Sequence, residues 1–170
     1  LINSSSVGAV AVSESSPDIV FIGMGENCIR GNIMPGDGVY KSGDAGKTWA
    51  HVGFRDVDAI SKIRIHPTNP DIVYVAAFGL YYGPSEERGV FKTTDGGKTW
   101  QFAGLYHVGQ IGAVRIHPTN PNIVWVAANG DVFKTNAERG VFKTDDGGKT
   151  WRKTLFVSDA VGSTDLELQP

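Results

Sequence analysis

The sequence predicts an all-β protein made of repeats of one small antiparallel unit. The first observation is an acidic, glycine-rich box, Ser/Thr-x-Asp-x-Gly-x-Thr-Trp, at residues 42–49, 93–100 and 144–151. Its copies lie 51 residues apart, and a period near fifty is typical of repeat architectures. The second observation is that short β-branched and aromatic segments, separated by Gly and Pro, precede each box. The third is that one segment per repeat is apolar without alternation, which predicts a strand covered on both faces.

The second repeat shows the order of elements within one unit. A first strand alternates polar and apolar residues and ends in a Pro-Thr-Asn-Pro turn at residues 67–70. The doubly apolar second strand follows, then a longer polar loop at 79–88, a third strand, the box and a fourth strand. We therefore expect strands at residues 61–66, 71–77, 89–93 and 99–103. Four short strands per unit and a buried second strand predict β-propeller blades.

The other repeats follow the same order, and the first repeat is the loosest copy. Residues 1–170 are thus predicted to form a partial propeller, with blades at 7–57, 60–106 and 111–157 and the first strand of a fourth blade at 161–170. Propellers close with about four to eight blades. We therefore expect the ring to be completed by further blades of the same polypeptide or by a second copy of the chain.

Composition narrows the classes of partner. The formal net charge is −2 and the basic residues are scattered, so we expect neither nucleic acid nor an anionic membrane as a partner. No apolar run approaches the roughly 20 residues that span a bilayer, so no membrane insertion is expected. The single cysteine, Cys28, excludes an internal disulfide and a CxxC-type zinc cluster. We expect no metal and no cofactor.

The boxes also carry a family resemblance. Their pattern resembles the Asp-box, or BNR repeat, of sialidases and related propellers. The recurring Ile-His-Pro-Thr-Asn-Pro and the segment 86–92 resemble bacterial BNR-repeat glycosyl hydrolases, which are similar in turn to the sortilin-type sorting-receptor propeller and to xyloglucanase-type enzymes. This resemblance implies an extracellular or periplasmic location, which the residues themselves do not indicate. It implies a glycosidase or a binding propeller as the activity.

We interpret the boxes as structural elements and not as active sites. Their carboxylates can accept N–H groups of the loop, their glycines permit positive φ, and their tryptophans can cover the turn. Equivalent carboxylates on successive blades would also lie too far apart to cooperate in catalysis, and calcium binding at Asp145–Asp146 is the lesser alternative. The residues concerned are Asp44, Gly46, Trp49, Asp95, Gly97, Trp100, Asp146, Gly148 and Trp151.

The face opposite the boxes is the expected functional face, because its loops differ between repeats on a rigid scaffold. We predict a ligand-binding face that includes Glu26, Arg30, Tyr81, Tyr82, His107 and Asp131. Asp56 and Asp58 are weak catalytic candidates, since glycoside hydrolysis needs two carboxyl groups. Arg64 and Arg115 share one register of the innermost strand and are expected to pack or form ion pairs. The favoured function is a non-catalytic scaffold for protein, peptide or glycan; the alternative is a glycosidase whose site is completed by missing blades or a partner chain.

Overall fold

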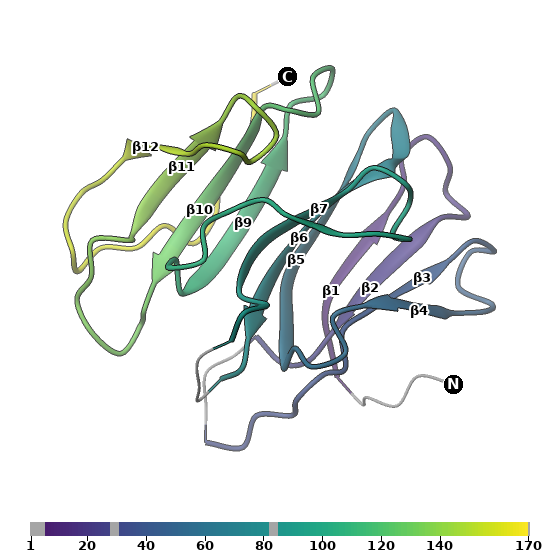
Figure 1. The fold of residues 1–170 in the computed structure, drawn as a ribbon, viewed down its shortest axis with the longest axis horizontal. Coiled ribbons are helices and arrows are strands. Elements are labelled where there is room, and N and C mark those ends of the chain that lie inside the picture. Colours follow the sequence, from purple (N-terminus) through teal and green to yellow (C-terminus); the bar gives the residue numbers. More distant parts are fainter. Residues whose placement is uncertain (1–5, 28–30, 82–84, 170) are drawn as a thin grey trace.

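The computed structural model describes residues 6–27, 31–81 and 85–169, and in these ranges it contains strands and no helix (Figure 1). The twelve strands form three antiparallel sheets of four, each in sequential order. The three sheets lie side by side as blades (Figure 1). The prediction of all-β propeller blades is therefore confirmed. The strands are β1 (Val7–Val12), β2 (Val20–Met24), β3 (Val39–Ser42) and β4 (Ala50–Gly53) in blade 1; β5 (Ala59–His66), β6 (Asn69–Gly79), β7 (Gly89–Thr93) and β8 (Gln101–Phe102) in blade 2; and β9 (Gln110–Ile116), β10 (Val124–Gly130), β11 (Gly140–Thr144) and β12 (Arg152–Leu155) in blade 3.

Two details differ from the expected elements. The Pro-Thr-Asn-Pro turn of blade 2 is tighter than predicted, because His66 pairs with Asn69 and β6 begins at that residue. The Asn69 side chain accepts the Asp71 N–H at 3.0 Å, which closes the turn locally. The segment predicted to start a further blade, residues 161–170, has an isolated bridge at Val161 and no strand in its described part. It runs beside β9 and β10, since the Ser163 N–H donates to the Ala128 carbonyl at 2.9 Å.

Two of the three buried apolar clusters are layers between neighbouring blades, and the third, smaller cluster lies within blade 1. In β6, Val73 and Val75 pack into the layer shared with blade 1, whereas Tyr74 and Ala76 pack into the layer shared with blade 3. All four side chains are fully buried. The non-alternating second strand of the sequence is thus explained by a blade on each side.

The tryptophans of the second and third boxes link blades 2 and 3 to the blade that precedes each of them. Trp100 Nε1 donates to the Val52 carbonyl of blade 1 at 2.7 Å, and Trp151 Nε1 donates to the Ala103 carbonyl of blade 2 at 2.6 Å. Each indole lies against a glycine that follows its acceptor: a Cβ at Gly104 would be 2.7 Å from Trp151 Nε1. A side chain there would displace the indole, so this contact requires glycine.

Lysines from the third strands of blades 1 and 2 also donate hydrogen bonds to the next blade. Lys41 Nζ donates to the Gly96 carbonyl of the next box at 2.9 Å, and Lys92 Nζ donates to Asn122 Oδ1 at 3.0 Å. The equivalent Lys143 instead pairs with Asp145 of its own box at 2.6 Å. On this outer side of blade 3, Leu155 stands where blades 1 and 2 have the glycine that receives the indole.

Each box is held together by its first hydroxyl and its aspartate. In blade 2, Thr93 Oγ1 donates to Asp95 Oδ1 at 2.7 Å and accepts the Gly97 N–H at 3.0 Å. Asp95 in turn accepts the Thr99 N–H and hydroxyl at 3.0 and 2.6 Å. These hydrogen bonds hold the pKa of Asp95 well below its usual value. The boxes of blades 1 and 3 repeat this arrangement, and the three box glycines have positive φ between 86° and 98°.

Candidate functional site

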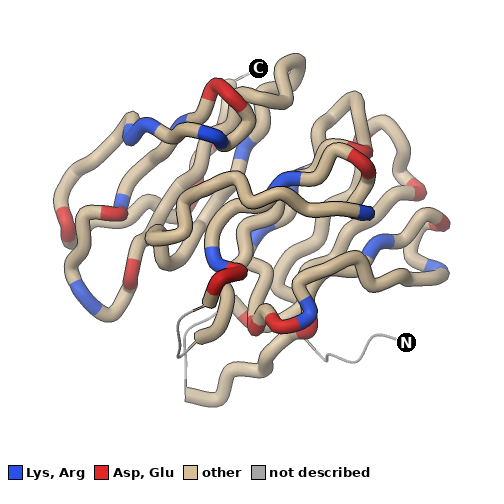
Figure 2. Tube along the Cα trace, in the orientation of Figure 1, with Lys and Arg blue, Asp and Glu red and all other residues tan. Residues whose placement is uncertain are grey.

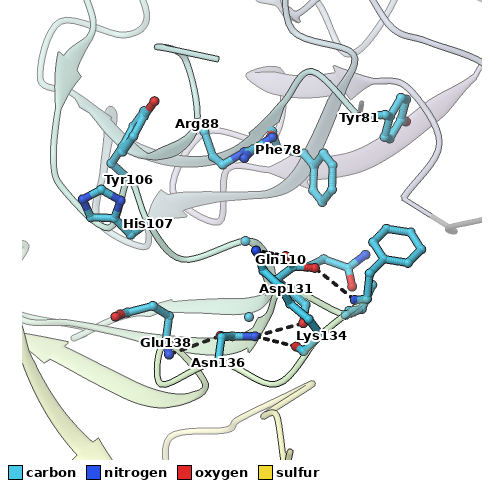
Figure 3. A pocket seen from close by; sticks show the side chains of 14 residues that line it. Phe78, Tyr81, Arg88, Tyr106, His107, Gln110, Asp131, Lys134, Asn136 and Glu138 are labelled. Carbon is cyan, nitrogen blue, oxygen red and sulfur yellow. Dashed lines mark hydrogen bonds and ion pairs between the residues drawn. The ribbon is translucent and has the colours of Figure 1, made fainter. Parts of the chain in front are cut away.

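The variable loops meet between blades 2 and 3, at the lower end of the sheets in Figure 1. A cavity of about 530 Å³ opens there, with the β6–β7 loop and the β8–β9 connection on one side and the β10–β11 loop on the other. Figure 3 shows Phe78, Arg88 and Tyr106 on the first side, facing Asn136 and Glu138 on the second. Three of the predicted ligand-face residues, Tyr81, His107 and Asp131, line this cavity.

The β10–β11 loop is shaped by hydrogen bonds to its own backbone. Asn136 Nδ2 donates to the carbonyls of Asp131 and Lys134 at 2.9 and 3.0 Å, and its Oδ1 accepts the Glu138 N–H at 3.2 Å. Arg139 donates from the other side to the same Asp131 carbonyl at 2.7 Å. The backbone of this wall is therefore organised before any ligand arrives.

An arginine holds the opposite loop in an equivalent way. Arg88 Nε and Nη2 donate to the carbonyls of Phe78 and Leu80, each at 2.8 Å, and the guanidinium lies 5.6 Å from the Phe78 ring centre. Arg88 and Arg139 occupy the same place in the repeated Glu-Arg-Gly before the third strand. Sequence reasoning missed this function, although the repetition of the arginine was a usable signal.

The rim of the cavity is apolar and its charges are balanced. Three large apolar side chains at the opening are exposed to solvent: Phe133 (73%), Val132 (41%) and Tyr106 (38%). Such a cluster of exposed apolar side chains is unusual on a protein surface. Asp131 pairs with Lys134 at 3.5 Å. Figure 2 shows acidic and basic residues interspersed along the trace. The site therefore offers a ligand apolar contact area, and it has no strong positive or negative electrostatic potential.

The remaining predicted ligand residues lie elsewhere or support the loops. Arg30 and Tyr82 lie outside the described residues. Glu26 belongs to the β2–β3 loop of blade 1, and its carbonyl accepts the Tyr81 hydroxyl, so the two predicted residues do meet. The Tyr81 ring also lies 5.4 Å from the Phe78 ring. Tyr81 thus connects the loops of blades 1 and 2 at the edge of the cavity.

The two weak catalytic candidates have different surroundings. Asp58 Oδ2 accepts the Tyr81 N–H at 2.9 Å, which gives this carboxylate a role in bracing the loop. Asp56 is exposed. Burial, and secondly the charge of Asp56, raise the pKa of Glu87 above its usual value. The charge of Asp56 thus acts on Glu87, a residue that the sequence analysis did not single out.

The innermost arginines form a separate cluster. Arg115 pairs with Asp165 at 3.2 Å and with Glu167, while Arg64 Nε donates to the Val114 carbonyl at 3.1 Å. Burial, and secondly the nearby Arg115, lower the pKa of Arg64. The Arg115 pairs tie the C-terminal segment to blade 3, and the Arg64 hydrogen bond ties blade 2 to blade 3. Among the described residues, His, Cys, Asp and Glu form no group that could hold a metal ion. The same residues include no helix that could span a membrane.

Comparison with known proteins identifies the family and the fold. The family model Sortilin-Vps10, described as sortilin, neurotensin receptor 3, matches residues 37–163. No curated protein sequence matches the chain.

Solved structures resemble the chain at low sequence identity. An ancestral GH74 enzyme is 20% identical with a TM-score of 0.62, covering 89% of this chain and 18% of that one. The GH74 xyloglucanase from Xanthomonas campestris is 19% identical with a TM-score of 0.61, covering 90% and 21%. YCF48 from Cyanidioschyzon merolae is 17% identical with a TM-score of 0.60, covering 94% and 41%. YCF48 bound to the D1 peptide is 13% identical with a TM-score of 0.60, covering 93% and 43%. The chain thus spans less than half the length of each of these structures, and the likeness shows the fold alone.

Proposed function

Because the chain belongs to the Sortilin-Vps10 family of Asp-box β-propellers, we propose that it is a non-catalytic binding module for a polypeptide. The ligand would lie on the loop face between blades 2 and 3. The observation that carries this proposal is the cavity of about 530 Å³, whose volume is in the range of ligand pockets. Solved propellers of similar fold support it, since one of them is YCF48 bound to the D1 peptide.

The chemistry of the walls favours a polypeptide over a glycan. A sugar presents hydroxyl groups on every side, and each hydroxyl that is buried on binding loses its hydration water. This loss costs free energy unless the site supplies a hydrogen-bond partner in place of the water. In this cavity Asn136 and Arg88 direct their donors to loop carbonyls, and Gln110 Nε2 donates to the Asn27 carbonyl at 3.1 Å. The exposed side chains of the rim include Tyr106, Val132 and Phe133, together with His107 and Lys134. Such a surface suits apolar side chains of a protein.

Peptide display tests the proposal directly. Random short peptides are panned against the immobilised 170-residue chain, and enriched peptides are titrated by fluorescence anisotropy. We expect enriched peptides to lose at least about fivefold in affinity with Tyr106→Ala, as contact residues that carry binding energy do. Phe102→Ala is the control, because that exposed aromatic residue lies in β8 and does not line the cavity. Enrichment of no peptide, or equal losses for both variants, would refute the proposal.

A glycosidase is the second candidate, and Glu87 is the observation that favours it. A carboxyl group with a raised pKa beside a second carboxyl group is the pattern of an acid and its partner in glycoside hydrolysis. Aryl glycosides and xyloglucan incubated with the chain test this function. Turnover that disappears with both Glu87→Gln and Asp56→Asn would favour an enzyme; an absence of turnover would leave the binding module as the better account.

A further inference from the structure

We infer that the cavity between blades 2 and 3 is an anchor site for one uncharged apolar side chain of the bound polypeptide, with Phe133 as its main contact. This inference rests on the proposed function and specifies its ligand. It identifies the guest by chemistry: an aromatic or branched aliphatic side chain on an extended segment.

The first step is the exposure of the rim. Phe133 is 73% exposed on the β10–β11 loop, and Val132 precedes it. Tyr106 stands on the opposite side, in the β8–β9 connection (Figure 3). A guest between the two sides would remove apolar surface of both blades from water at once, which is the arrangement of a binding hot spot.

The second step is the rigidity of the loop that displays Phe133. Asp131 Oδ1 accepts the Phe133 N–H at 3.0 Å, and Asn136 and Arg139 both donate to the Asp131 and Lys134 carbonyls on either side of it. The Asn136 N–H donates to the Asp159 carbonyl at 3.0 Å, which ties the loop to the segment after β12. A loop that is already ordered loses little conformational entropy on binding, so contacts to it contribute more of their energy to affinity.

The third step concerns charge. The charged residues that line the cavity are two basic and two acidic ones, namely Arg88, Lys134, Asp131 and Glu138. The lining therefore has no excess of positive or negative charge. Lys134 is paired with Asp131, and the Arg88 guanidinium donates to two carbonyls. An acidic guest would give up its hydration while both basic groups are already engaged, and a basic guest would do so while Asp131 is already paired, which is unfavourable. An uncharged guest meets no such cost.

A host–guest series of blocked peptides, acetyl-Gly-Gly-X-Gly-Gly-amide, tests the inference, with Phe, Leu, Glu or Lys as X. Each peptide is titrated into the isotope-labelled chain, and amide shifts in the β10–β11 loop report binding. We expect Phe and Leu to bind at least about fivefold more tightly than Glu and Lys, as burial of an apolar side chain predicts. Phe133→Ala should reduce Phe-peptide affinity by at least about fivefold.

The matched control is Phe156→Ala, which removes an exposed phenyl ring on the segment after β12, away from the cavity lining. It should leave Phe-peptide affinity unchanged, and both variants should keep the melting temperature of the parent chain. Equal binding of the Glu or Lys peptide, no effect of Phe133→Ala, or no shift with any of the four peptides would overturn the inference. Peptides enriched by display would still stand in those cases, so failure here is distinct from failure of the proposed function.

Discussion

Replacing Thr93 by valine should destabilise blade 2 although valine has almost the same shape. Thr93 is 1% exposed, and its hydroxyl accepts N–H groups of Asp95 and Gly97 at 3.3 and 3.0 Å while it donates to Asp95 Oδ1. The methyl group of valine fills the space of the hydroxyl, so no cavity forms. The loss is therefore confined to hydrogen bonding.

The size of this destabilisation depends on whether water can replace the lost hydroxyl as a hydrogen-bond partner of each group. The Asp95 carboxylate is accessible on the box, so water replaces the lost hydroxyl there. The Gly97 N–H is buried, and a buried donor left without an acceptor costs about 1–3 kcal/mol. For a domain of this size each kcal/mol lowers the melting temperature by roughly 2–4 °C, so a decrease of about 2–12 °C is expected.

Differential scanning calorimetry, together with urea unfolding, measures this effect. The control is Thr94→Val, because Thr94 is the exposed neighbour of the same residue type. The control should melt within about 2 °C of the parent chain, as exposed substitutions generally do. Equal melting temperatures for the two variants would show that the hydroxyl of Thr93 does not hold the box together.

Two further predictions concern the blade contacts and the box aspartates. Gly104→Ala should destabilise the chain by about 1–3 kcal/mol, because the new Cβ would lie 2.7 Å from Trp151 Nε1 and the backbone φ there is 94°. Gly43→Ala is the control: a Cβ at Gly43 would have nothing within 4 Å, so the melting temperature should change little in the same assay. Hydrogen bonds from Thr48 lower the pKa of Asp44 to about 2, so its contribution to stability is present above the unfolded pKa near 3.8 and is lost as the pH falls. The melting temperature should therefore decline between about pH 4 and pH 2, and a flat profile over that interval would contradict the role of the boxes.

Much of the architecture was predictable because its signals are local and repeated. The boxes at one spacing predicted equivalent units, and the doubly apolar second strand predicted a neighbour on each face of the sheet. The structure confirms both through three equivalent sheets, with Val73 and Tyr74 packing in opposite directions. The role of the Trp100 indole in joining blades was not predicted, since its acceptor, the Val52 carbonyl, belongs to the preceding repeat.

The candidate site was predictable only in part. Variation between repeats selected loops that meet at one cavity, which Tyr81, His107 and Asp131 line. Phe133 was missed because an exposed phenylalanine in a loop has no sequence pattern of its own. Asp58 was considered for catalysis, yet its carboxylate accepts a backbone N–H of the neighbouring loop. Such a contact depends on where two loops meet, which single-sequence reasoning does not supply.

The sequence by itself determined the all-β repeat, the strand order within a blade and the position of the boxes. These features depend on side-chain periodicity and on turn residues that act within a few positions of one another. Only the tertiary structure decided which loops share a cavity and which carboxyl groups interact. Phe78 and Phe133 are 55 residues apart in the chain and line one space because blades 2 and 3 pack face to face. The chemistry of that space arises from the packing of whole blades, so no local pattern could encode it.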